Sequence, residues 1–509
     1  MAALVALAGC GGSNGSSNSN STTTWTAGSY QASTKFANQC ASPRTGTDPT
    51  TGKAYLDTAG SATTENNFLR SWTNELYLWY REAPDLDPSA YTTANYFPLL
   101  KTSATTPSGN AKDKFHFTYT TSDWVALSQS GVEAGYGANF LVLAPRPPRQ
   151  VVVAYSDPGT PAASANLVRG AQVVTVDGVD AINAGDSTSV ATLNAGMFPS
   201  AAGSSHTFGI LDPGATTPRT ITMVSANVTS TPVQNVTTMR NGSGTVGYLL
   251  FNDHIATAEQ QLVSAFGQLA AAGVNDLVLD IRYNGGGYLD IASEVEYMIA
   301  GPAATTGRTF ERTVFNDKYT TKDPVTGEAL TPIGFHSTTL GFSGPTGQAL
   351  PTLNLSRVAV LTGGNTCSAS EAIVNSLRGV GVQVVQIGAT TCGKPYGFYP
   401  QDNCGTTYFS IEFQGVNDQG FGDYPDGFSP GNATSSIGVA LPGCAVADDF
   451  GHQLGDRNEG RLAAALGFFS NQGCPAVSLA PPPGVAQAAV AGEGLLHKSP
   501  WRENRILRR

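Results

Sequence analysis

The sequence predicts a multidomain α/β protein whose C-terminal half contains a βαβ unit. Residues 358–361 and 382–388 are apolar runs of the length of buried strands, and a helical pattern at 369–377 lies between them. Two strands joined by a helix are expected to lie parallel and side by side. Residues 276–282 form a third run of this kind, followed by a glycine-rich turn and a helical pattern at 289–299. The 509 residues are enough for two to four domains.

The N-terminal region, residues 25–115, is predicted to form a helical cap. Its large apolar residues share one helical face, which we expect to serve packing rather than to line a ligand site. They are Phe68, Leu69, Trp72, Leu76, Trp79 and Tyr80. Pro84 and Pro88 follow and are expected to end the helix.

A small β domain is predicted for residues 116–235. Short strands and turns occur at 135–140, 151–154, 156–163, 167–170 and 173–178. This succession resembles a PDZ domain of the bacterial protease type. The resemblance implies that a glycine-rich turn receives a peptide carboxylate and that the peptide adds a strand to the sheet. The turn consists of Gly135, Tyr136, Gly137 and Ala138. Ala171 stands where such domains usually carry aspartate, and a β domain without a ligand is the alternative.

Two polar residues follow the strands of the βαβ unit and are expected at the same edge of the sheet. Ser368 precedes the helix, where free backbone N–H groups and the helix dipole favour an oxyanion. Lys394 follows the second strand and is the candidate base for the Ser368 hydroxyl. Glu371 lies in the first helical turn and is expected to cap the helix rather than to act as an acid.

A lysine that acts as a base must lose its proton near neutral pH. A free lysine has a pKa of about 10.4, and lowering it to about 7.5 requires roughly 4 kcal/mol of differential interaction. Burial among apolar groups supplies this difference by penalising the charged form. The apolar residues expected around Lys394 are Ile387, Tyr396, Phe398 and Tyr399.

Three motifs occur in order along the C-terminal half: LDIRYNGGG at 279–287, CSASEA at 367–372 and CGKP at 392–395. Together they resemble the C-terminal processing, or tail-specific, serine peptidases, over residues 60–475. The resemblance implies a ClpP/crotonase-like catalytic core in residues 236–475 and a Ser-Lys dyad in place of Ser-His-Asp.

The resemblance also implies a role for each motif residue. Ser368 would be the nucleophile and Lys394 the general base, while the backbone N–H groups of Ala369 and Gly286 would form the oxyanion hole. Many members of the family carry a glutamine four residues after the lysine, and this position is Phe398 here. Gln401 is the candidate to orient Lys394 instead.

The predicted activity is cleavage of protein C-terminal tails or unfolded polypeptides through an acyl-enzyme, with no cofactor and no metal. A catalytically inert peptide-binding envelope protein on the same scaffold and a hydrolase of small esters are the alternatives. The net charge of −10 and the pI of about 5.1 argue against nucleic acid as a partner. His254, His336 and His452 lack the spacing of metal ligands.

The N-terminus predicts export from the cytoplasm. Residues 1–10 end in Leu-Ala-Gly-Cys, which resembles a bacterial lipoprotein signal with Cys10 as the lipidated residue. A polar tether at 11–24 follows, and an ordinary small-residue leader is the alternative. The expected location is the cell envelope, in the periplasm or on the outer face of a membrane, with a lipid anchor. The tail, residues 476–509, is predicted to be disordered.

Seven cysteines become six when Cys10 is assigned to lipid, and an even number fits an oxidising compartment. Proximity in sequence suggests Cys392–Cys404 and Cys444–Cys474 as pairs, which leaves Cys40 and Cys367. The other pairings remain open at this point.

Overall fold

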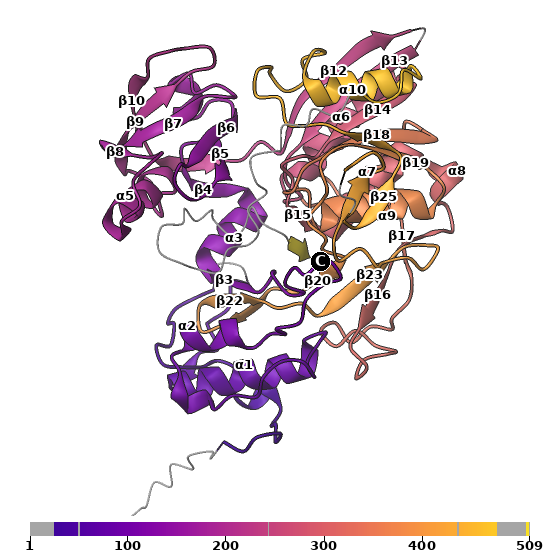
Figure 1. Cartoon of the computed structure of the whole chain (residues 1–509). Coiled ribbons are helices and arrows are strands. Elements are labelled where there is room, and N and C mark those ends of the chain that lie inside the picture. The colour runs from indigo at the N-terminus through magenta and orange to yellow at the C-terminus, as the bar shows by residue number, and fades with distance from the viewer. Residues whose placement is uncertain (1–24, 49–50, 243, 435–436, 476–504, 508–509) are drawn as a thin grey trace, which may run out of the picture.

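The computed structural model describes residues 25–48, 51–242, 244–434, 437–475 and 505–507. Cys10 and the predicted tether lie outside the described residues. Figure 1 shows three bodies, namely a helical layer formed by the N-terminal region, a small β domain and a larger α/β domain. The prediction of a mixed α/β fold is therefore confirmed.

A six-stranded sheet forms the centre of the larger domain. In spatial order its strands are β12 (Val233–Asn241), β13 (Gly244–Phe251), β14 (Asp276–Asp280), β18 (Arg357–Thr362), β19 (Gln383–Gly388) and β26 (Gly443–Ala445). β12 is antiparallel to β13, and the other neighbours are parallel. The predicted βαβ unit is confirmed, because α9 (Ala369–Gly379) joins β18 to β19 and Thr362 lies opposite Gly388.

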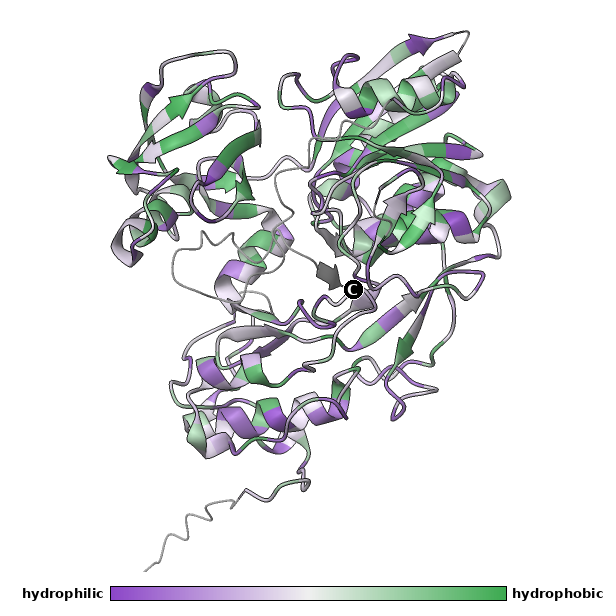
Figure 2. Cartoon of the chain, viewed as in Figure 1, coloured by the Kyte–Doolittle hydropathy of each residue, from purple (hydrophilic) through white to green (hydrophobic). Residues whose placement is uncertain are grey.

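Helices cover both faces of this sheet, which explains why its strands read as continuous apolar runs. α6 (Ala258–Ala271), α7 (Leu289–Ala300) and α9 share one core with Val358 and Val360 of β18. α10 (Gly460–Phe469) shares the opposite core with Ala359 and Leu361. The alternation follows the two-residue period of a strand. Figure 2 shows hydrophobic residues running through these strands.

A second, four-stranded sheet lies at the carboxyl ends of the central strands. Its order is β17 (Ile333–Gly334), β16 (Thr309–Phe315), β23 (Phe413–Val416) and β20 (Tyr396–Gly397). The apolar run at 406–413 is divided between two strands, because β22 (Thr406–Phe409) ends before Ser410 and β23 begins after Glu412 in a different sheet. The carbonyl of Ile411 accepts from the N–H of Leu78 at 2.8 Å, so the interruption serves contact with the N-terminal region.

The N-terminal layer is built onto strands from the C-terminal half. α1 (Ala62–Leu76) buries Phe68, Leu69 and Trp72, as its periodicity predicts. Trp72 packs edge-on against Tyr408 of β22, with ring centroids 6.5 Å apart. β22 also pairs with β3 (Phe117–Thr120) and with β21 (Gln401–Asn403). The cap is therefore continuous with the larger domain.

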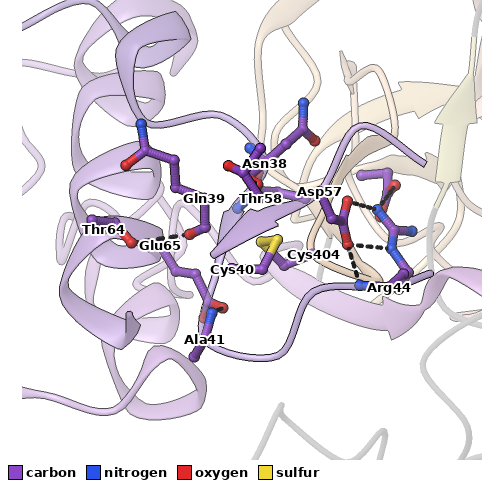
Figure 3. Close-up of a disulfide and its surroundings, with 12 residues drawn as sticks. Asn38, Gln39, Cys40, Ala41, Arg44, Asp57, Thr58, Thr64, Glu65 and Cys404 are labelled. Carbon is purple, nitrogen blue, oxygen red and sulfur yellow. Dashed lines mark hydrogen bonds and ion pairs between the residues drawn. A yellow bond between two sulfur atoms is a disulfide. The ribbon is translucent and has the colours of Figure 1, made fainter. Parts of the chain in front are cut away.

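A disulfide between Cys40 and Cys404 joins this layer to β22 across 364 residues of sequence. Figure 3 shows the bond beside the ion pair in which Arg44 Nη2 contacts Asp57 Oδ1 at 2.9 Å. Arg44 also contacts Asp402 in β21, at 2.9 Å. Residues 40–57 are thus joined to β21 and to the turn that follows it.

The small β domain contains the sheet β10 (Arg219–Val224), β9 (Ser205–Leu211), β7 (Gln172–Val176), β6 (Gln150–Ser156) and β5 (Ala138–Ala144), with β8 (Val179–Asp180) beside β7. α5 (Ser187–Met197) packs against it. β4 (Val132–Gly135) and β11 (Ala226–Thr229) pair with each other where the chain enters and leaves. The domain begins near residue 132 rather than 116, since β3 pairs with β22 and α3 (Thr121–Ser130) follows it directly.

The remaining elements are short. They are β1 (Gln39–Cys40), β2 (Thr58–Ala59), α2 (Thr93–Tyr96), α4 (Pro161–Ser164), α8 (Pro302–Thr305), β24 (Phe428–Pro430), β25 (Val439–Leu441) and three 3₁₀ turns at Ser33–Lys35, Pro88–Ala90 and Phe97–Leu99. Within the described ranges, no helix combines the length and apolar character needed to cross a bilayer.

Two sequence predictions are wrong in detail. Cys444–Cys474 is confirmed as a disulfide, but Cys392 is bonded to Cys367 and not to Cys404. The tail was predicted to be disordered throughout, yet residues Arg505–Leu507 form β27, which pairs in parallel with β15 (Gly286–Tyr288). Neither feature has a local sequence signal, because each joins segments that are distant along the chain.

Candidate active site

Ser368 occupies the tight turn between β18 and α9. Its φ of 63° and ψ of −117° lie in a region that residues other than glycine rarely adopt. Such strain is held in place by surrounding contacts and is found at functional sites. The residue is fully buried, and its Oγ makes no hydrogen bond to the described residues. The turn therefore presents a hydroxyl at the helix N-terminus, where the first-turn N–H of Ala369 also lies.

Lys394 follows β19, the strand that pairs with β18. Its side chain is fully buried. The Nζ atom lies 4.2 Å from the ring centroid of Phe398 and 4.8 Å from that of Phe115. The amine is therefore enclosed by two aromatic rings, one from the N-terminal layer and one from the segment that follows Lys394. Phe398 thus supplies a ring face where the resemblance led us to look for a glutamine amide.

Glu371 connects the two residues through their backbones. Its Oε2 accepts from the N–H of Ser368 at 3.1 Å and from the N–H of Lys394 at 2.8 Å. Its Oε1 accepts from the N–H of Gly393 at 2.9 Å and from the hydroxyl of Thr391. Burial raises the pKa of Glu371, while these hydrogen bonds oppose the shift. Glu371 is therefore more than the helix cap that the sequence predicts.

The disulfide Cys367–Cys392 forms a second link between the same two segments. Cys367 directly precedes Ser368, and Cys392 lies two residues before Lys394. In the part of the chain that the structure describes, Cys367, Glu371 and Cys392 form a group with metal-ligand atoms close together. The disulfide uses both sulfurs, so neither is available as a thiolate ligand or as a nucleophile.

The glycine run lies across from the nucleophile turn, and Asn284 positions it. Asn284 Oδ1 accepts from the N–H of Gly286 at 2.9 Å, and its carbonyl accepts from the N–H of Cys367 at 3.1 Å. The predicted oxyanion donor Gly286 is therefore already engaged. The N–H of Tyr288 donates to the carbonyl of His254 at 2.8 Å.

Because backbone groups alternate sides along a strand, the N–H of Gly287 points to the opposite edge of β15. Gly287 has a φ of 138°, and a Cβ at this position would lie 2.5 Å from the carbonyl oxygen of His254. Only glycine fits here, which explains the motif.

Residues 245–398 include all of these motifs, and they match peptidase family S41. The chain carries a peptidase family S41 domain. Over 138 residues it is 29% identical to a carboxyl-terminal-processing protease of Picosynechococcus sp. strain PCC 7002. The matched segment covers 27% of this chain and 32% of that protein, so the chain spans about a third of the length of this relative.

The chain also resembles solved structures over more than residues 245–398. A putative S41 protease from Bacteroides fragilis NCTC 9343 superposes with a TM-score of 0.58 at 22% identity, over 80% of this chain and 97% of that one. The photosystem II D1 C-terminal processing protease gives a TM-score of 0.42 at 21% identity, over 75% of this chain and 94% of that one. The first of these shows a shared fold.

A buried network of ion pairs and hydrogen bonds surrounds Arg282 and Tyr283, which precede the glycine run. Arg282 pairs with Glu459 at 2.7 and 2.9 Å and with Asp280 at 2.9 Å. Tyr283 donates to Asp448 Oδ2 at 2.5 Å, and Arg169 of the small β domain contacts Asp448 Oδ1 at 2.5 Å. Asp280 and Arg282 therefore support the loop that carries the glycines.

Arg169 also donates to the hydroxyl of Tyr283, at 2.6 Å, so the small β domain contacts the residue that precedes Asn284. Burial acts to raise the pKa of Asp448, but the charges of Arg461, Arg282 and Arg169 outweigh it and lower that pKa. The network thus holds a charged carboxylate between the two domains.

The side-chain amide of Gln401 donates within its own strand rather than to the Lys394 segment. It lies in β21, and its Nε2 donates to the carbonyl of Asp402 at 2.8 Å. Two other predicted neighbours of Lys394 also point elsewhere. The hydroxyl of Tyr399 donates to Asp323 at 2.7 Å, and Ile387 belongs to the core on the α10 side of the sheet.

The predicted peptide-binding turn joins β4 to β5 in the small β domain. The carbonyls of Tyr136 and Gly137 accept from Ala162 and Asp157, at 2.9 and 2.7 Å. The Tyr136 ring is buried, and its hydroxyl donates to Gly196. Gly135 ends β4 and Ala138 begins β5, which is an edge strand of its sheet.

Sequence reasoning missed the contribution of the N-terminal layer to the site. Phe115 contacts the Lys394 amine, and Lys114 Nζ donates to the carbonyl of Cys392 at 2.8 Å. Burial lowers the pKa of Lys114, while Glu371 and Asp426 raise it. These residues lie more than 250 positions before their partners, and nothing local in the sequence marks them. Asn284 does have a local signal, because it directly precedes the three glycines of the motif.

Proposed function

We propose that this chain is a serine endopeptidase that acts through Ser368 and Lys394 and cleaves protein C-terminal tails or unfolded polypeptides. The observation that carries the proposal is the shared carboxylate, because the N–H groups of both residues donate to the same oxygen of Glu371. The backbones of a buried serine and a buried lysine are held together in this way inside the segment that matches family S41, and this supports their pairing as nucleophile and base.

In the proposed reaction the Oγ of Ser368 bonds to the scissile carbonyl carbon while its proton passes to the Nζ of Lys394. The oxyanion is stabilised by the N–H groups of Ala369 and Gly287, the latter in place of Gly286. The carbon–nitrogen bond then breaks, and Lys394 gives its proton to the leaving amine. Water then attacks the acyl carbon and loses a proton to Lys394, the bond between Oγ and the acyl carbon breaks, and Lys394 returns the proton to the Oγ of Ser368 as the new carboxylate leaves.

The small β domain is proposed to act as a PDZ-like tether for the peptide. β5 is an edge strand, and an extended peptide can pair with such an edge by main-chain hydrogen bonds. The turn from Gly135 to Ala138 leads directly into it. The proposed location is the cell envelope, with Cys10 as a lipid attachment site, and this fits the three disulfides.

Mapping of the acylated residue tests the proposal. Purified protein is treated with a fluorophosphonate probe, and the labelled peptide is identified by mass spectrometry. We expect the wild type to be labelled at Ser368, the Lys394→Ala variant to carry no label there, and the Ser368→Ala variant to carry no label on the corresponding peptide. Casein cleavage is measured on the same three proteins, and cleavage that persists in Ser368→Ala would refute the peptidase assignment.

Two alternatives predict different outcomes in the same assays. An inert peptide-binding protein on this scaffold would leave Ser368 unlabelled. A hydrolase of small esters would be labelled but would turn over an ester substrate and leave casein and unfolded polypeptides intact.

A further inference from the structure

The C-terminal segment of the chain lies against the glycine run. β27 pairs in parallel with β15, with Arg505 opposite Gly286, Ile506 opposite Gly287 and Leu507 opposite Tyr288. It also lies against β20, which begins two residues after Lys394. Figure 1 shows the C-terminal end beside β15 and β20 in the middle of the molecule. Residues 505–507 thus lie between the segments that carry the proposed oxyanion donor and the proposed base.

This position is the one that an extended substrate would need. One edge of β15 is used by His254, which bonds to Gly286 and Tyr288. The other edge presents the N–H and carbonyl of Gly287, and β27 pairs there. A peptide on this edge runs past the same N–H that is proposed to stabilise the oxyanion. The pairing uses backbone groups alone, so it does not depend on a particular sequence.

Charge also favours retention of the tail. Residues 498–509 are rich in lysine and arginine, whereas the whole chain carries a formal net charge of −10. A basic segment tethered to an acidic protein is attracted to its own surface. Residues 476–504 connect it to Cys474, which is anchored by its disulfide to Cys444.

We propose that the C-terminal tail, through residues 505–507, is an intramolecular inhibitor that occupies the substrate strand of the peptidase. The inference rests on the proposed function for its consequence, but the pairing itself can be tested without catalysis. Substrate polypeptides must displace the tail before they pair with β15, so inhibition is competitive and raises KM while kcat is unchanged.

The size of the effect follows from tethering. A segment tethered by a linker of about 30 residues has an effective concentration of about 1 mM. If the free tail peptide binds with a Kd of about 0.1 mM, this edge of β15 is occupied about ten times more often than it is empty, and KM rises roughly tenfold.

Proline substitution in the full-length chain provides the test. In a parallel ladder with this register, the N–H of Leu507 points at β15 and faces the carbonyl of Gly287. Leu507→Pro removes this donor. Leu496→Pro is the matched control, because it places the same substitution in the tail outside β27. We expect Leu507→Pro to lower the KM for a fluorogenic peptide about tenfold at constant kcat, and Leu496→Pro to leave both unchanged.

Hydrogen exchange separates this proposal from the proposed activity. Exchange of the amides at 286–288 is compared among Ser368→Ala, Ser368→Ala with Leu507→Pro, and Ser368→Ala with Leu496→Pro. Faster exchange only with Leu507→Pro supports the tail as occupant, whatever the activity. Equal exchange in all three, or equal KM in the two proline variants of an active enzyme, overturns it. If no variant labels or cleaves, the proposed function fails while the exchange result still decides the position of the tail.

Discussion

Glu371→Gln is the substitution that tests most directly how the site is held. The carboxylate accepts four hydrogen bonds, two on each oxygen, from Ser368, Lys394, Gly393 and Thr391. An amide keeps one acceptor oxygen and replaces the other with an NH₂ group. If the NH₂ group faces Ser368 and Lys394, two buried N–H groups lose their acceptor, at about 1–3 kcal/mol each.

The loss therefore amounts to about 2–6 kcal/mol, shared between stability and the placement of the two residues. If about 3 kcal/mol of it appears in the transition state, kcat falls roughly 100-fold. KM should change little, because Glu371 is a positioning residue that does not reach the substrate strand. The assay is steady-state hydrolysis of a fluorogenic peptide, with the rate of probe labelling at Ser368 as a second readout.

Glu412→Gln is the matched control for loss of a buried carboxyl. Burial raises the pKa of Glu412 to about 8, so this group is neutral near pH 7. It accepts from the N–H of Tyr399, five residues after Lys394, at 3.0 Å. We expect its kcat to stay within about twofold of the wild type. A Glu371→Gln enzyme with wild-type kcat would refute the positioning role.

Two further predictions concern the disulfides and pH. Replacing Cys367 and Cys392 together by serine should lower kcat about tenfold, because this bond, with a sequence separation of 25, links the nucleophile turn to the lysine segment. Replacing Cys444 and Cys474 by serine is the matched control, because this bond has a separation of 30 and each double variant should lose about 3 kcal/mol of stability. This control should leave kcat unchanged, so equal kcat in the two double variants would contradict the argument. Burial lowers the pKa of His116 to about 4, whereas in the unfolded chain this pKa is about 6.5. Between these two pH values the unfolded chain binds a proton that the folded protein does not bind. The free energy of unfolding therefore falls by about 3 kcal/mol as the pH falls from 6.5 to 4. His116→Gln should reduce this loss in urea titrations at pH 7 and 4.5, and an unchanged difference between the two pH values would show that His116 is not responsible.

The part of the site that lies on the βαβ unit could be predicted from the sequence. Ser368 and Lys394 directly follow strands whose apolar runs are local signals, and parallel pairing brings them to one edge. The glycine run was recognised, but the choice between Gly286 and Gly287 depends on which edge of β15 bonds to His254 and on the side chain of Asn284. These are tertiary contacts without a periodic signature.

Long-range contacts account for the other misses. Phe115, Lys114 and Cys40 contact residues of the C-terminal half that lie hundreds of positions away. Pairing of Cys392 by proximity in sequence failed because the fold brings Cys367 next to it across the helix of the βαβ unit. The interruption at Ser410 was missed because the apolar pattern continues through it while the backbone leaves the sheet to reach Leu78.

The Cys40–Cys404 bond limits the stage of synthesis at which the N-terminal layer can be joined to the C-terminal half. One sulfur belongs to an early part of the chain and the other to a late part, so the bond cannot close until translation has passed residue 404. The aromatic wall that Phe115 provides for the lysine is secured by the same layer. A nascent chain therefore cannot close this bond, which holds the layer that brings Phe115 to the Lys394 amine, before residue 404 has been synthesised.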